Sequence, residues 1–245
     1  MLLLIDLGNS RFKWRCDDAH GSFMHKDADL AALLKDTFAA LPAPEKIALS
    51  NVAGDQLEKT VIDWCGLHWP KAKLVLAKLQ NPVPALASNY SSHSLGVDRW
   101  LAMLAVASKN NNRPFIVIDC GSAVTIDAVN GASVHLGGVI IPGLNMLHSS
   151  LVTGAVAIQQ AMTLVTNVMA MTTADAVSAG CINTLAAGID AVVNKMQAEL
   201  GKSAVNCYLT GGDADRIRPM LVTDVFLESE LVLEGLRKYV ELDEC

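Results

Sequence analysis

A short motif occurs twice in this chain and constrains the fold more than any other feature of the sequence. The first copy is Leu2 to Trp14 (LLLIDLGNSRFKW), and the second is Phe115 to Val129 (FIVIDCGSAVTIDAV). Each copy has an apolar run that ends in Ile-Asp-x-Gly, then a small polar residue and a second extended stretch. Short apolar runs that end at a glycine turn predict buried strands. Each copy therefore predicts a hairpin with an aspartate at its turn.

Predicted strands and helices alternate along the rest of the chain, as in an α/β fold. Strands are expected at residues 21–26, 46–53, 72–77, 134–141, 205–209 and 224–227, helices at 29–40, 55–67, 96–109, 144–171, 183–200 and 229–240, and a loop at 81–94. A threonine N-cap at Thr172-Thr173 predicts that a new helix begins there. Asn110 to Pro114 (NNNRP) has turn-forming residues, which predicts a boundary between two lobes. The lobes are expected at residues 1–112 and 113–245, each of a related β-β-β-α-β-α type.

Composition and charge exclude several classes of protein. With 245 residues, 51% of them hydrophobic and 18% charged, the chain is long enough to bury a substantial core. A net charge of -6 argues against broad binding to nucleic acid or anionic lipid. The apolar run Leu2 to Ile5 is too short for a signal peptide, and no uninterrupted run approaches the roughly 18 apolar residues of a membrane span. We therefore expect a cytoplasmic protein with no nucleic-acid or membrane partner.

The cysteines and histidines lack the spacing of a metal site. The cysteines form no CxxC pair and are interpreted as reduced core residues rather than disulfides or zinc ligands. The histidines form no HExxH pattern, and each is expected to be an ordinary surface or core residue. These residues are Cys16, Cys65, Cys120, Cys181, Cys207 and Cys245, and His20, His25, His68, His93, His135 and His148.

The two hairpin turns are candidate phosphate-binding sites. Neither GxxxxGK[ST] nor GxGxxG occurs, so a P-loop and a dinucleotide-binding turn are excluded. In DLGNS and DCGSA, glycine allows backbone N–H groups to approach phosphate oxygens, and the aspartates can hold a hydrated cation beside them. A single Asp-x-Gly turn more often only ends a strand, but two copies in matching contexts favour a functional site. A third glycine turn, TGGD at Thr210 to Asp213, suits close packing against a base or ribose.

An ordered set of motifs gives the chain a specific resemblance. The duplicated DxG hairpins and the late TGG turn resemble the actin, hexokinase and Hsp70 superfamily of ATP-binding folds. Together with LGVDRW, GGVIIPGL and TGGDADRI, they resemble the type III pantothenate kinase family from Met1 to the C-terminal helix. The resemblance implies an α/β fold of two related actin-like (ribonuclease H-like) lobes with mixed sheets and an ATP site in the cleft between them.

The resemblance also implies an activity, namely ATP-dependent phosphorylation of pantothenate to 4′-phosphopantothenate, the first step of coenzyme A biosynthesis. Asp6 would lie near Mg²⁺, and Asp119 would bind a monovalent cation, potassium or ammonium. Ser122 would contact ATP where the family usually has threonine. The ATP phosphates would be bound by the first hairpin, which comprises Asp6, Leu7, Gly8, Asn9, Ser10, Arg11, Phe12 and Lys13.

Asp98 matches the general base of the family, which takes the proton from the pantothenate hydroxyl. Gly96, Val97 and Arg99 would position the substrate, and Arg99 offers a fork for a carboxylate. Apart from the resemblance, Asp98 and Arg99 also fit a first-turn helix acid and a surface ion pair. Lys13 could reach phosphate or, like most strand lysines, be solvated.

Two further residues, Tyr90 and Thr173, match substrate-contacting positions. A loop tyrosine is otherwise a packing residue, and Thr173 could instead be a helix N-cap. Thr172 stands where the family pattern has asparagine. Family members are homodimers with the substrate site close to the subunit interface, so a homodimer is expected here.

Two alternatives remain open beside pantothenate phosphorylation. A kinase of the same fold could phosphorylate a sugar or another small alcohol, and a nucleotide-responsive regulator could keep the fold without catalysis. The presence of Asp6, Asp98 and Asp119 and the absence of a basic DNA-reading motif argue against the regulator.

Overall fold

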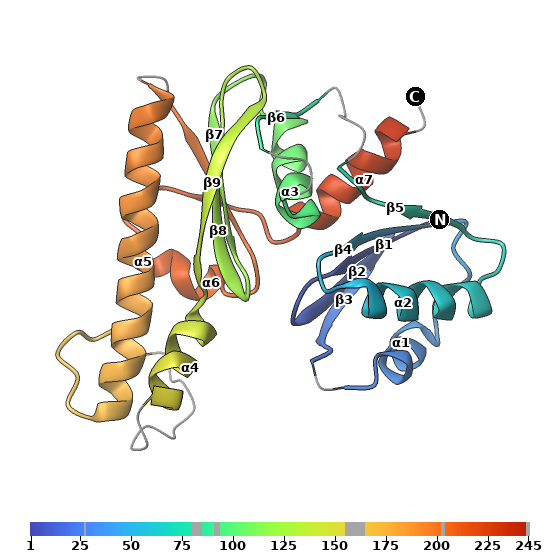
Figure 1. Ribbon diagram of the computed structural model, residues 1–245, viewed down its shortest axis with the longest axis horizontal. Helices are drawn as coiled ribbons and strands as arrows, with labels where there is room; N and C mark the ends of the chain where they lie inside the picture. The colour runs from blue at the N-terminus through green and yellow to red at the C-terminus, as the bar shows by residue number, and fades with distance from the viewer. Residues whose placement is uncertain (27, 80–84, 91–93, 155–164, 202–203, 244–245) are drawn as a thin grey trace. The chain divides into compact units, whose positions relative to one another are not determined.

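The computed structural model describes residues 1–26, 28–79, 85–90, 94–154, 165–201 and 204–243 (Figure 1). The chain divides into two compact units. Unit 1 contains Met1–Leu86, Ser91–Lys109 and Leu231–Cys245, and unit 2 contains Ala87–Tyr90 and Asn110–Glu230. His93, Cys245 and parts of the expected loop 81–94 and helix 144–171 lie outside the described residues.

Unit 1 is built on a five-stranded mixed sheet with the strand order β3-β2-β1-β4-β5. The first three strands form antiparallel pairs, whereas β4 runs parallel to β1 and β5 runs parallel to β4. These strands are β1 (Leu2–Leu7), β2 (Arg11–Cys16), β3 (Ala19–Met24), β4 (Lys46–Asn51) and β5 (Lys73–Leu76). Both faces of β1 are buried, which explains its nearly continuous apolar run.

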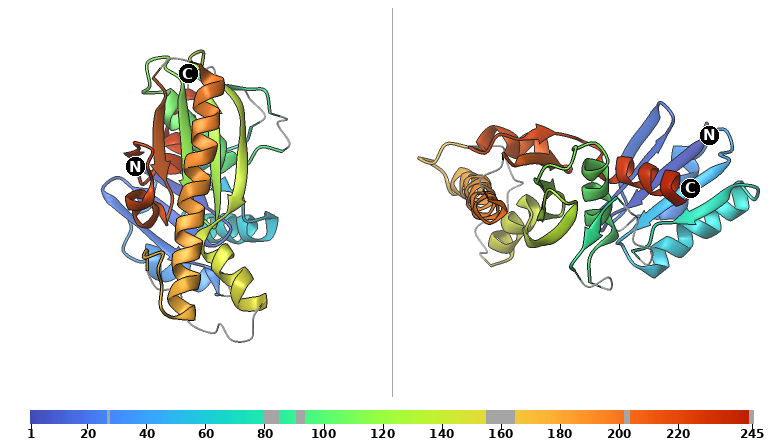
Figure 2. Two further views of the ribbon diagram at one scale, coloured as in Figure 1. Left: turned by 90° about the vertical axis from the view of Figure 1, so that its left-hand side faces the viewer. Right: turned by 90° about the horizontal axis from the view of Figure 1, so that it is seen from above.

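Helices cover both faces of this sheet. On one face, α1 (Leu30–Phe38) and α2 (Asp55–His68) enclose an aromatic core in which Phe12 stacks on Phe23 at 4.7 Å. The carboxylate of Asp29 starts α1 by accepting hydrogen bonds from the backbone N–H groups of Ala31 and Ala32. Figures 1 and 2 show α3 (Val97–Ala107) and α7 (Leu231–Asp243) on the opposite face, where they contact β1 and β4.

The C-terminal helix α7 packs directly against α3, so it groups with unit 1 and not with the second half of the sequence, where it is expected. The backbone of Gly235 lies so close to the carbonyl oxygen of Leu101 that no side chain fits between the helices. The rings of Trp100 and Tyr239 meet edge to face with their centroids 6.0 Å apart. This contact is tertiary, and local sequence patterns do not encode it.

Unit 2 repeats the topology of unit 1. Its six-stranded sheet has the order β11-β10-β7-β8-β9-β6. The strands are β6 (Ala87–Ser88), β7 (Phe115–Cys120), β8 (Ala123–Val129), β9 (Val134–Pro142), β10 (Asn206–Thr210) and β11 (Phe226–Leu227). Without the short edge strand β6, the order and strand directions match those of unit 1, with β7 in the place of β1. The repeated hairpin motif therefore belongs to a repeated sheet.

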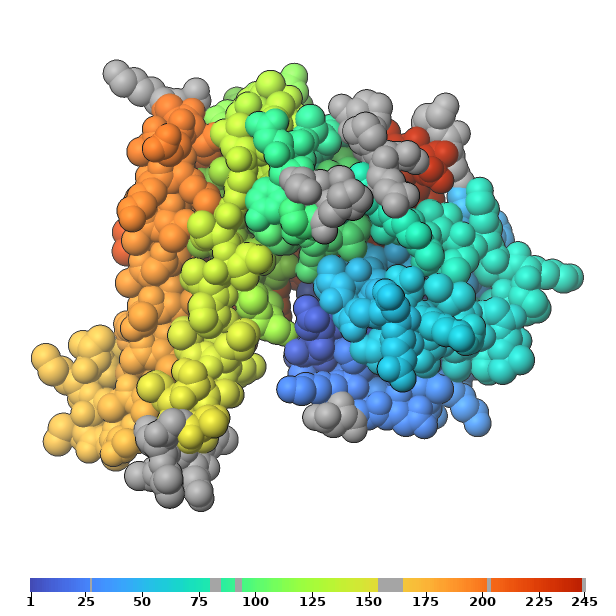
Figure 3. Space-filling model, viewed as in Figure 1, coloured from blue at the N-terminus to red at the C-terminus, as the bar shows by residue number. Residues whose placement is uncertain are grey.

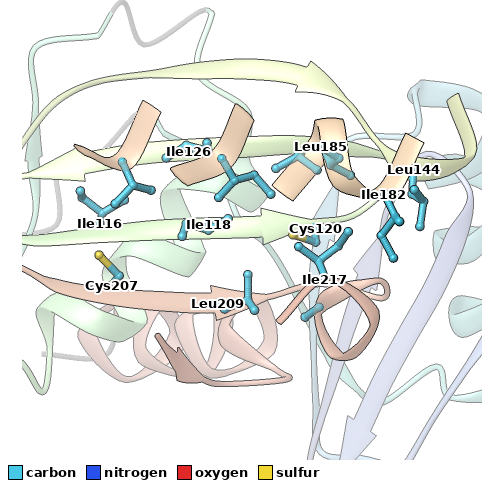
Figure 4. Close-up of a cluster of buried hydrophobic side chains, with 14 of the residues drawn as sticks. Ile116, Ile118, Cys120, Ile126, Leu144, Ile182, Leu185, Cys207, Leu209 and Ile217 are labelled. Carbon is cyan, nitrogen blue, oxygen red and sulfur yellow. The ribbon is translucent and has the colours of Figure 1, made fainter. Parts of the chain in front are cut away.

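The helices of unit 2 are α4 (Leu144–Gly154), α5 (Thr173–Leu200) and α6 (Ala214–Ile217), followed by a 3-10 turn at Arg218–Met220. Figure 4 shows Ile182 and Leu185 of α5 gathered with Ile118, Cys120 and Ile217 in the core. The helix expected after the threonine N-cap at Thr172-Thr173 is confirmed, because α5 begins at Thr173 and continues through 183–200 as one helix. One expectation was wrong: residues 165–172 are not helical, so the described part of the helix expected at 144–171 is α4.

Within the described residues, α5 alone is long and apolar enough to span a membrane, with a mean hydropathy of 1.5 over its most apolar window. The mean hydropathy of α5 is high although polar residues interrupt its apolar stretches, which is why the sequence shows no uninterrupted apolar run of this length. Half of that window is buried inside the protein, because Ile182, Leu185, Ile189 and Val193 pack on the sheet. Figure 3 shows the rest of α5 as an orange column along the surface of unit 2. Its hydropathy is thus that of a core helix.

Candidate active site

The first hairpin has a three-residue loop that is fixed by its neighbours. The loop contains Gly8, Asn9 and Ser10, and the N–H of Gly8 donates to the carbonyl oxygen of Arg11 at 3.1 Å. His25 closes the loop from the other side. Its Nε2 donates to the Gly8 carbonyl oxygen at 2.7 Å, and its backbone N–H donates to the Ser10 carbonyl oxygen at 3.3 Å. His25 is buried, so of the two alternatives for the histidines, surface or core, the core alternative is correct for it. Its hydrogen bonds to the loop could not be inferred from the spacing of the motif.

The strands of this hairpin divide its side chains between two faces. Leu7 and Phe12 lie opposite each other and are fully buried in the aromatic core, so only their backbones can reach a ligand. Asp6 and Lys13 lie opposite each other on the other face. The exposed side chains of Asn9 and Arg11 complete the groups that a phosphate could reach, although the Arg11 guanidinium also donates to Ser22 Oγ at 3.2 Å.

A row of polar side chains crosses three strands of unit 1. Asp6 on β1 is paired with Lys13 on β2 and with Ser50 on β4, so the three side chains share one face. Asp6 is buried, and Ser50 Oγ is buried with no hydrogen-bond partner among the residues that the structure describes. A buried carboxylate beside a hydroxyl that lacks a partner offers the oxygen donors that Mg²⁺ prefers. These residues therefore fit a site for Mg²⁺.

The second hairpin has a two-residue loop, Gly121 and Ser122, one residue shorter than the first. Its turn is closed by a hydrogen bond from the N–H of Gly121 to the carbonyl oxygen of Ala123 at 3.1 Å. Asp119 lies in the middle of a polar row, paired with Thr125 on β8 and Thr210 on β10. Asp119 thus occupies in unit 2 the position that Asp6 has in unit 1.

Two glycines let other turns approach this second hairpin. Gly211 has φ +100°, and a Cβ there would lie 2.5 Å from Asp119 Oδ1 and would also collide with the backbone of Cys120. A Cβ at Gly143 would lie 2.7 Å from the carbonyl oxygen of Gly121. The resulting cradle combines a carboxylate with backbone carbonyl oxygens, a donor set that suits a hard cation of low charge. The close packing of the Gly211 turn on the second hairpin is enough to explain why residue 211 is glycine. The expected contact of this turn with a base or ribose remains a prediction.

Two carboxylates, Asp119 and Asp213, lie near Cys120 in this cradle, and Asp213 is also paired with Arg216 at 3.0 Å. Burial raises the pKa of the Cys120 thiol to about 12, with further increases from the charges of Asp119 and Asp213, so the thiol stays protonated and unreactive. Among the described residues, no group of three or more His, Cys, Asp or Glu side chains could hold a metal ion. Within the part of the chain that the structure describes, any cation at Asp6 or Asp119 would thus have at most two such side chains as ligands, with hydroxyl, carbonyl or substrate oxygens around it.

The first turn of α3 presents Asp98 in a fixed orientation. The backbone N–H of Arg99 donates to Asp98 Oδ1 at 2.8 Å. A Cβ at Gly96, the N-cap residue, would lie 2.5 Å from the same oxygen, so a side chain there would force the Asp98 carboxylate to move. Arg99 is only 7% exposed, which excludes the alternative of a surface ion pair. Val97 is buried and can contribute chiefly through its backbone.

Thr172, and not Thr173, is the N-cap of α5. Its Oγ1 accepts a hydrogen bond from the backbone N–H of Asp175 at 3.1 Å and donates to Asp175 Oδ2 at 2.8 Å. The N-cap interpretation of Thr173 is therefore wrong. Thr173 is the first helical residue and is exposed to solvent.

Tyr90 belongs to unit 2, where it follows the edge strand β6. Its ring is half-buried and stacks on His135 with a centroid distance of 5.6 Å. Its backbone N–H donates to Ser88 Oγ at 3.1 Å. The packing interpretation is therefore correct for one side of the ring, while the partly exposed part can still meet a ligand.

A hollow of about 610 Å³ in unit 1 lies elsewhere, between the starts of α1 and α2. It is lined by Asp29 and Asp55 but by none of the predicted site residues. Two carboxylates at helix N-termini make it a poor site for phosphate. The predicted residues in unit 1 instead gather on β1, β2 and the start of α3.

The repeated sheets with aspartates at their hairpins define an actin-like ATPase and sugar-kinase fold. A putative 2-dehydro-3-deoxygalactonokinase from Sinorhizobium meliloti has a TM-score of 0.59 at 12% identity, covering 98% of this chain and 96% of that chain. A structure from Campylobacter jejuni, described as a conserved putative Baf family transcriptional activator, has a TM-score of 0.65 at 22% identity, covering 99% and 98% of the chains. The expected fold class is confirmed.

Sequence comparison identifies the family within this fold. The family profile described as type III pantothenate kinase matches residues 2–195. A type III pantothenate kinase from Nitrosococcus oceani is 31% identical over 248 residues, which cover 97% of this chain and 93% of the relative. One from Teredinibacter turnerae is 34% identical over 256 residues, covering 99% and 100%. The chain belongs to the type III pantothenate kinase family.

Proposed function

We propose that this protein transfers the γ-phosphoryl group of ATP to the primary hydroxyl of pantothenate and forms 4′-phosphopantothenate, the first step of coenzyme A biosynthesis. The observation that carries the proposal is the start of α3, where the backbone N–H of Arg99 holds the Asp98 carboxylate and Gly96 leaves room for it. This arrangement lies in a chain that belongs to a family of pantothenate kinases.

The transfer itself needs positioning and one proton acceptor. The pantothenate hydroxyl oxygen forms a bond to the γ-phosphorus, the bond from that phosphorus to the ADP oxygen breaks, and the hydroxyl proton goes to Asp98. Phosphoryl transfer is loose, so the proton can leave late and orientation matters more than the basicity of the acceptor. Arg99 binds the pantothenate carboxylate, and Gly96 and Val97 shape the backbone around it.

Residues 6–13 of the first hairpin bind the ATP phosphates in this proposal. Leu7 and Phe12 contribute backbone groups, because their side chains are buried in the core. Gly8, Ser10 and the side chains of Asn9, Arg11 and Lys13 face the phosphates. Asp6, with Ser50 beside it on the sheet, would hold Mg²⁺. Bound there, Mg²⁺ would neutralise negative charge on the phosphates.

Asp119 would hold the monovalent cation, potassium or ammonium, within the glycine cradle of unit 2. The carbonyl oxygens of the hairpin turn and the neighbouring threonine on β8 offer uncharged donors beside its carboxylate. Ser122, in the loop of the same hairpin, contacts ATP. Tyr90 and Thr173, whose side chains are both accessible, contact pantothenate.

A homodimer and a cytoplasmic location complete the proposal. Unit 2 exposes many large apolar side chains, and a second copy of the chain would bury them. They are Leu136, Val139, Ile140, Met146, Leu151, Val168, Met169, Met171, Val222 and Phe226. The cysteines among the described residues are all free and buried, which suits a reducing compartment.

The decisive experiment assays the purified protein with ATP, Mg²⁺, potassium and pantothenate and detects phosphopantothenate by mass spectrometry. Formation of the product, reduced when sodium replaces potassium, supports the enzyme and the cation together. A panel of sugars and small alcohols runs in parallel, and turnover of one of them with pantothenate inert would contradict the proposed acceptor. ATP binding without turnover of any acceptor would favour the regulator.

A further inference from the structure

A chain of hydrogen bonds in unit 2 connects Asp127 on β8 to Tyr90. His135 Nε2 lies 2.9 Å from Asp127 Oδ1, and His135 Nδ1 lies 3.0 Å from Ser88 Oγ. Ser88 Oγ in turn accepts the backbone N–H of Tyr90 at 3.1 Å. The directions are consistent: Tyr90 donates to Ser88, the Ser88 hydroxyl donates to Nδ1, and Nε2–H donates to the carboxylate. Every bond in the chain has one donor and one acceptor.

An irregularity in β9 directs His135 toward this chain. His135 is paired with Val129 on β8, but the next pair joins Ala128 to Gly137, so Leu136 is an extra residue in β9. Asp127 and Val129 point to the same face of β8, and His135 therefore reaches Asp127 diagonally. His135 is completely buried, whereas the extra residue Leu136 is 47% exposed.

The edge strand β6 brings Ser88 to the same place. Ser88 is paired with His135 in a parallel ladder, and the N–H of Asn89 donates to the His135 carbonyl oxygen at 3.2 Å. Backbone bonds on both sides of Ser88 thus fix the start of the segment that ends at Tyr90. The imidazole of His135 is bound to both Ser88 and Asp127 and also stacks on the Tyr90 ring at an interplanar angle of 23°.

The combination of serine, histidine and aspartate does not make a hydrolytic site here. In serine hydrolases, Nε2 of the histidine faces the serine and Nδ1 faces the aspartate, which is the reverse of this arrangement. His135 is also inaccessible to a substrate. Because Ser88 Oγ uses a lone pair to accept the Tyr90 N–H, its role is to orient the tyrosine.

We propose that Ser88, His135 and Asp127 are positioning residues that set the place and ring orientation of Tyr90 for binding pantothenate. The inference rests on the proposed function, in which Tyr90 contacts that substrate, and assigns residues to the support of the contact. Ser88 fixes the backbone of Tyr90, and His135 fixes the ring plane. Asp127 holds the imidazole in the tautomer that accepts from Ser88.

Ser88→Ala tests the inference, with Ser108→Ala as the matched control. Ser108 loses one partly buried hydroxyl bond, to the Leu104 carbonyl oxygen, away from this chain. Ser88→Ala should raise the KM for pantothenate about 3- to 10-fold, the range for one lost hydrogen bond, with kcat and the KM for ATP within about twofold. Ser88→Thr keeps the hydroxyl and should restore most of the affinity. An unchanged KM for pantothenate, or an equal rise in both KM values, overturns the inference.

A double-mutant cycle separates positioning from an independent contact. If Ser88 acts through Tyr90, Ser88→Ala should add less than about twofold to the KM of a Tyr90→Ala variant. Full additivity of the two effects would show that Ser88 does not act through Tyr90. Thermal unfolding of each variant identifies any that fail to fold, and if Tyr90→Ala is one of them, Tyr90→Leu, which also lacks the ring, takes its place in the cycle.

Hydrogen exchange gives a readout that does not depend on the substrate. Without its acceptor, the amide of Tyr90 should exchange at least about threefold faster in Ser88→Ala than in the wild type and in Ser108→Ala. Equal exchange would overturn the inference even if the protein phosphorylated a different alcohol. Conversely, faster exchange in Ser88→Ala, found together with a wild-type protein that leaves pantothenate unphosphorylated, would remove the proposed function while keeping the hydrogen-bonded chain that positions Tyr90.

Discussion

Asp6 and Asp119 occupy equivalent positions in two sheets of the same strand order. Each lies near the end of the central strand and is paired with one residue on an antiparallel neighbour and one on a parallel neighbour. Their surroundings differ in charge, because Asp6 is paired with Lys13 whereas Asp119 is paired with Thr125. A lysine suits the phosphates of a nucleotide, and uncharged oxygens suit a monovalent cation, so this difference agrees with the proposal that the two aspartates serve different ligands.

Asp98→Asn should reduce kcat for pantothenate phosphorylation by at least about 100-fold while leaving ATP affinity and the unfolding temperature nearly unchanged, because it removes the proton acceptor but keeps the shape. Steady-state kinetics and thermal unfolding check this. The matched control is Asp55→Asn, since Asp55 is also a first-turn acid of a helix in unit 1. If Asp98 served only the helix dipole, both variants would keep normal turnover.

Gly211→Ala should destabilise the second hairpin and weaken activation by potassium. The new methyl group would meet the backbone of Cys120 and the Asp119 carboxylate, and φ at this position is +100°, which disfavours any side chain. The potassium concentration for half-maximal activity should rise several-fold, and the unfolding temperature should fall. Gly188→Ala is the control, because its Cβ would meet nothing within 4 Å and it lies inside α5, where alanine is favoured. Equal behaviour of the two variants would contradict the packing argument.

Asp190 should stabilise unit 2 at neutral pH but not in acid. Burial alone would raise its pKa, but hydrogen bonds from the Thr223 hydroxyl and from the backbone N–H groups of Val222 and Thr223 outweigh burial and hold the pKa below its usual value. A depressed folded-state pKa gives stability that is present above the unfolded pKa, about 3.9, and is lost as pH falls through the folded value.

Asp190→Asn should therefore lower the free energy of unfolding at pH 7 by about 1 kcal/mol, a figure that allows for the partial exposure of the group. Thermal unfolding at a series of pH values measures the effect. The difference between variant and wild type should shrink below about pH 4. A difference that stays constant from pH 7 to pH 3 would show that the carboxylate charge is not involved.

Met146→Glu should shift the protein from dimer to monomer. Met146 on α4 is 52% exposed and belongs to the apolar side chains that we propose for the subunit interface. A charge at this position would have to lose its water when the two subunits associate, which disfavours the dimer. Sedimentation velocity measures the shift. Leu67→Glu in α2 is the control, since Leu67 is 78% exposed on unit 1. A wild-type monomer, or dissociation by both changes, would contradict the assignment.

The sequence predicts the elements that local pattern encodes. Apolar runs and glycine turns locate β1, β4 and β7 within a few residues, and the duplicated motif predicts two related sheets. Strand β6 has only two residues and no periodic pattern, so it was not predicted. The threonines at 172 and 173 predicted a helix start, and Thr172 does cap α5.

The candidate site divides in the same way. Asp6, Asp98 and Asp119 were predicted because each belongs to a recognisable motif. The roles of Ser50 and His135 depend on strand register, which pairs Ser50 with Asp6 and lets an extra residue in β9 turn His135 toward Asp127. Register comes from tertiary packing, so it could not be derived from local patterns.

The return of α7 to unit 1 has a consequence for the order in which the protein can fold on the ribosome. Residues 1–109 supply the first sheet and α3, but the helix that packs against Leu101 is made only after residue 230. The apolar surface of α3 therefore stays without its partner α7 while residues 110–230 are synthesised. During that interval α3 lacks the helix that covers it, so the first unit to emerge is the last to be completed.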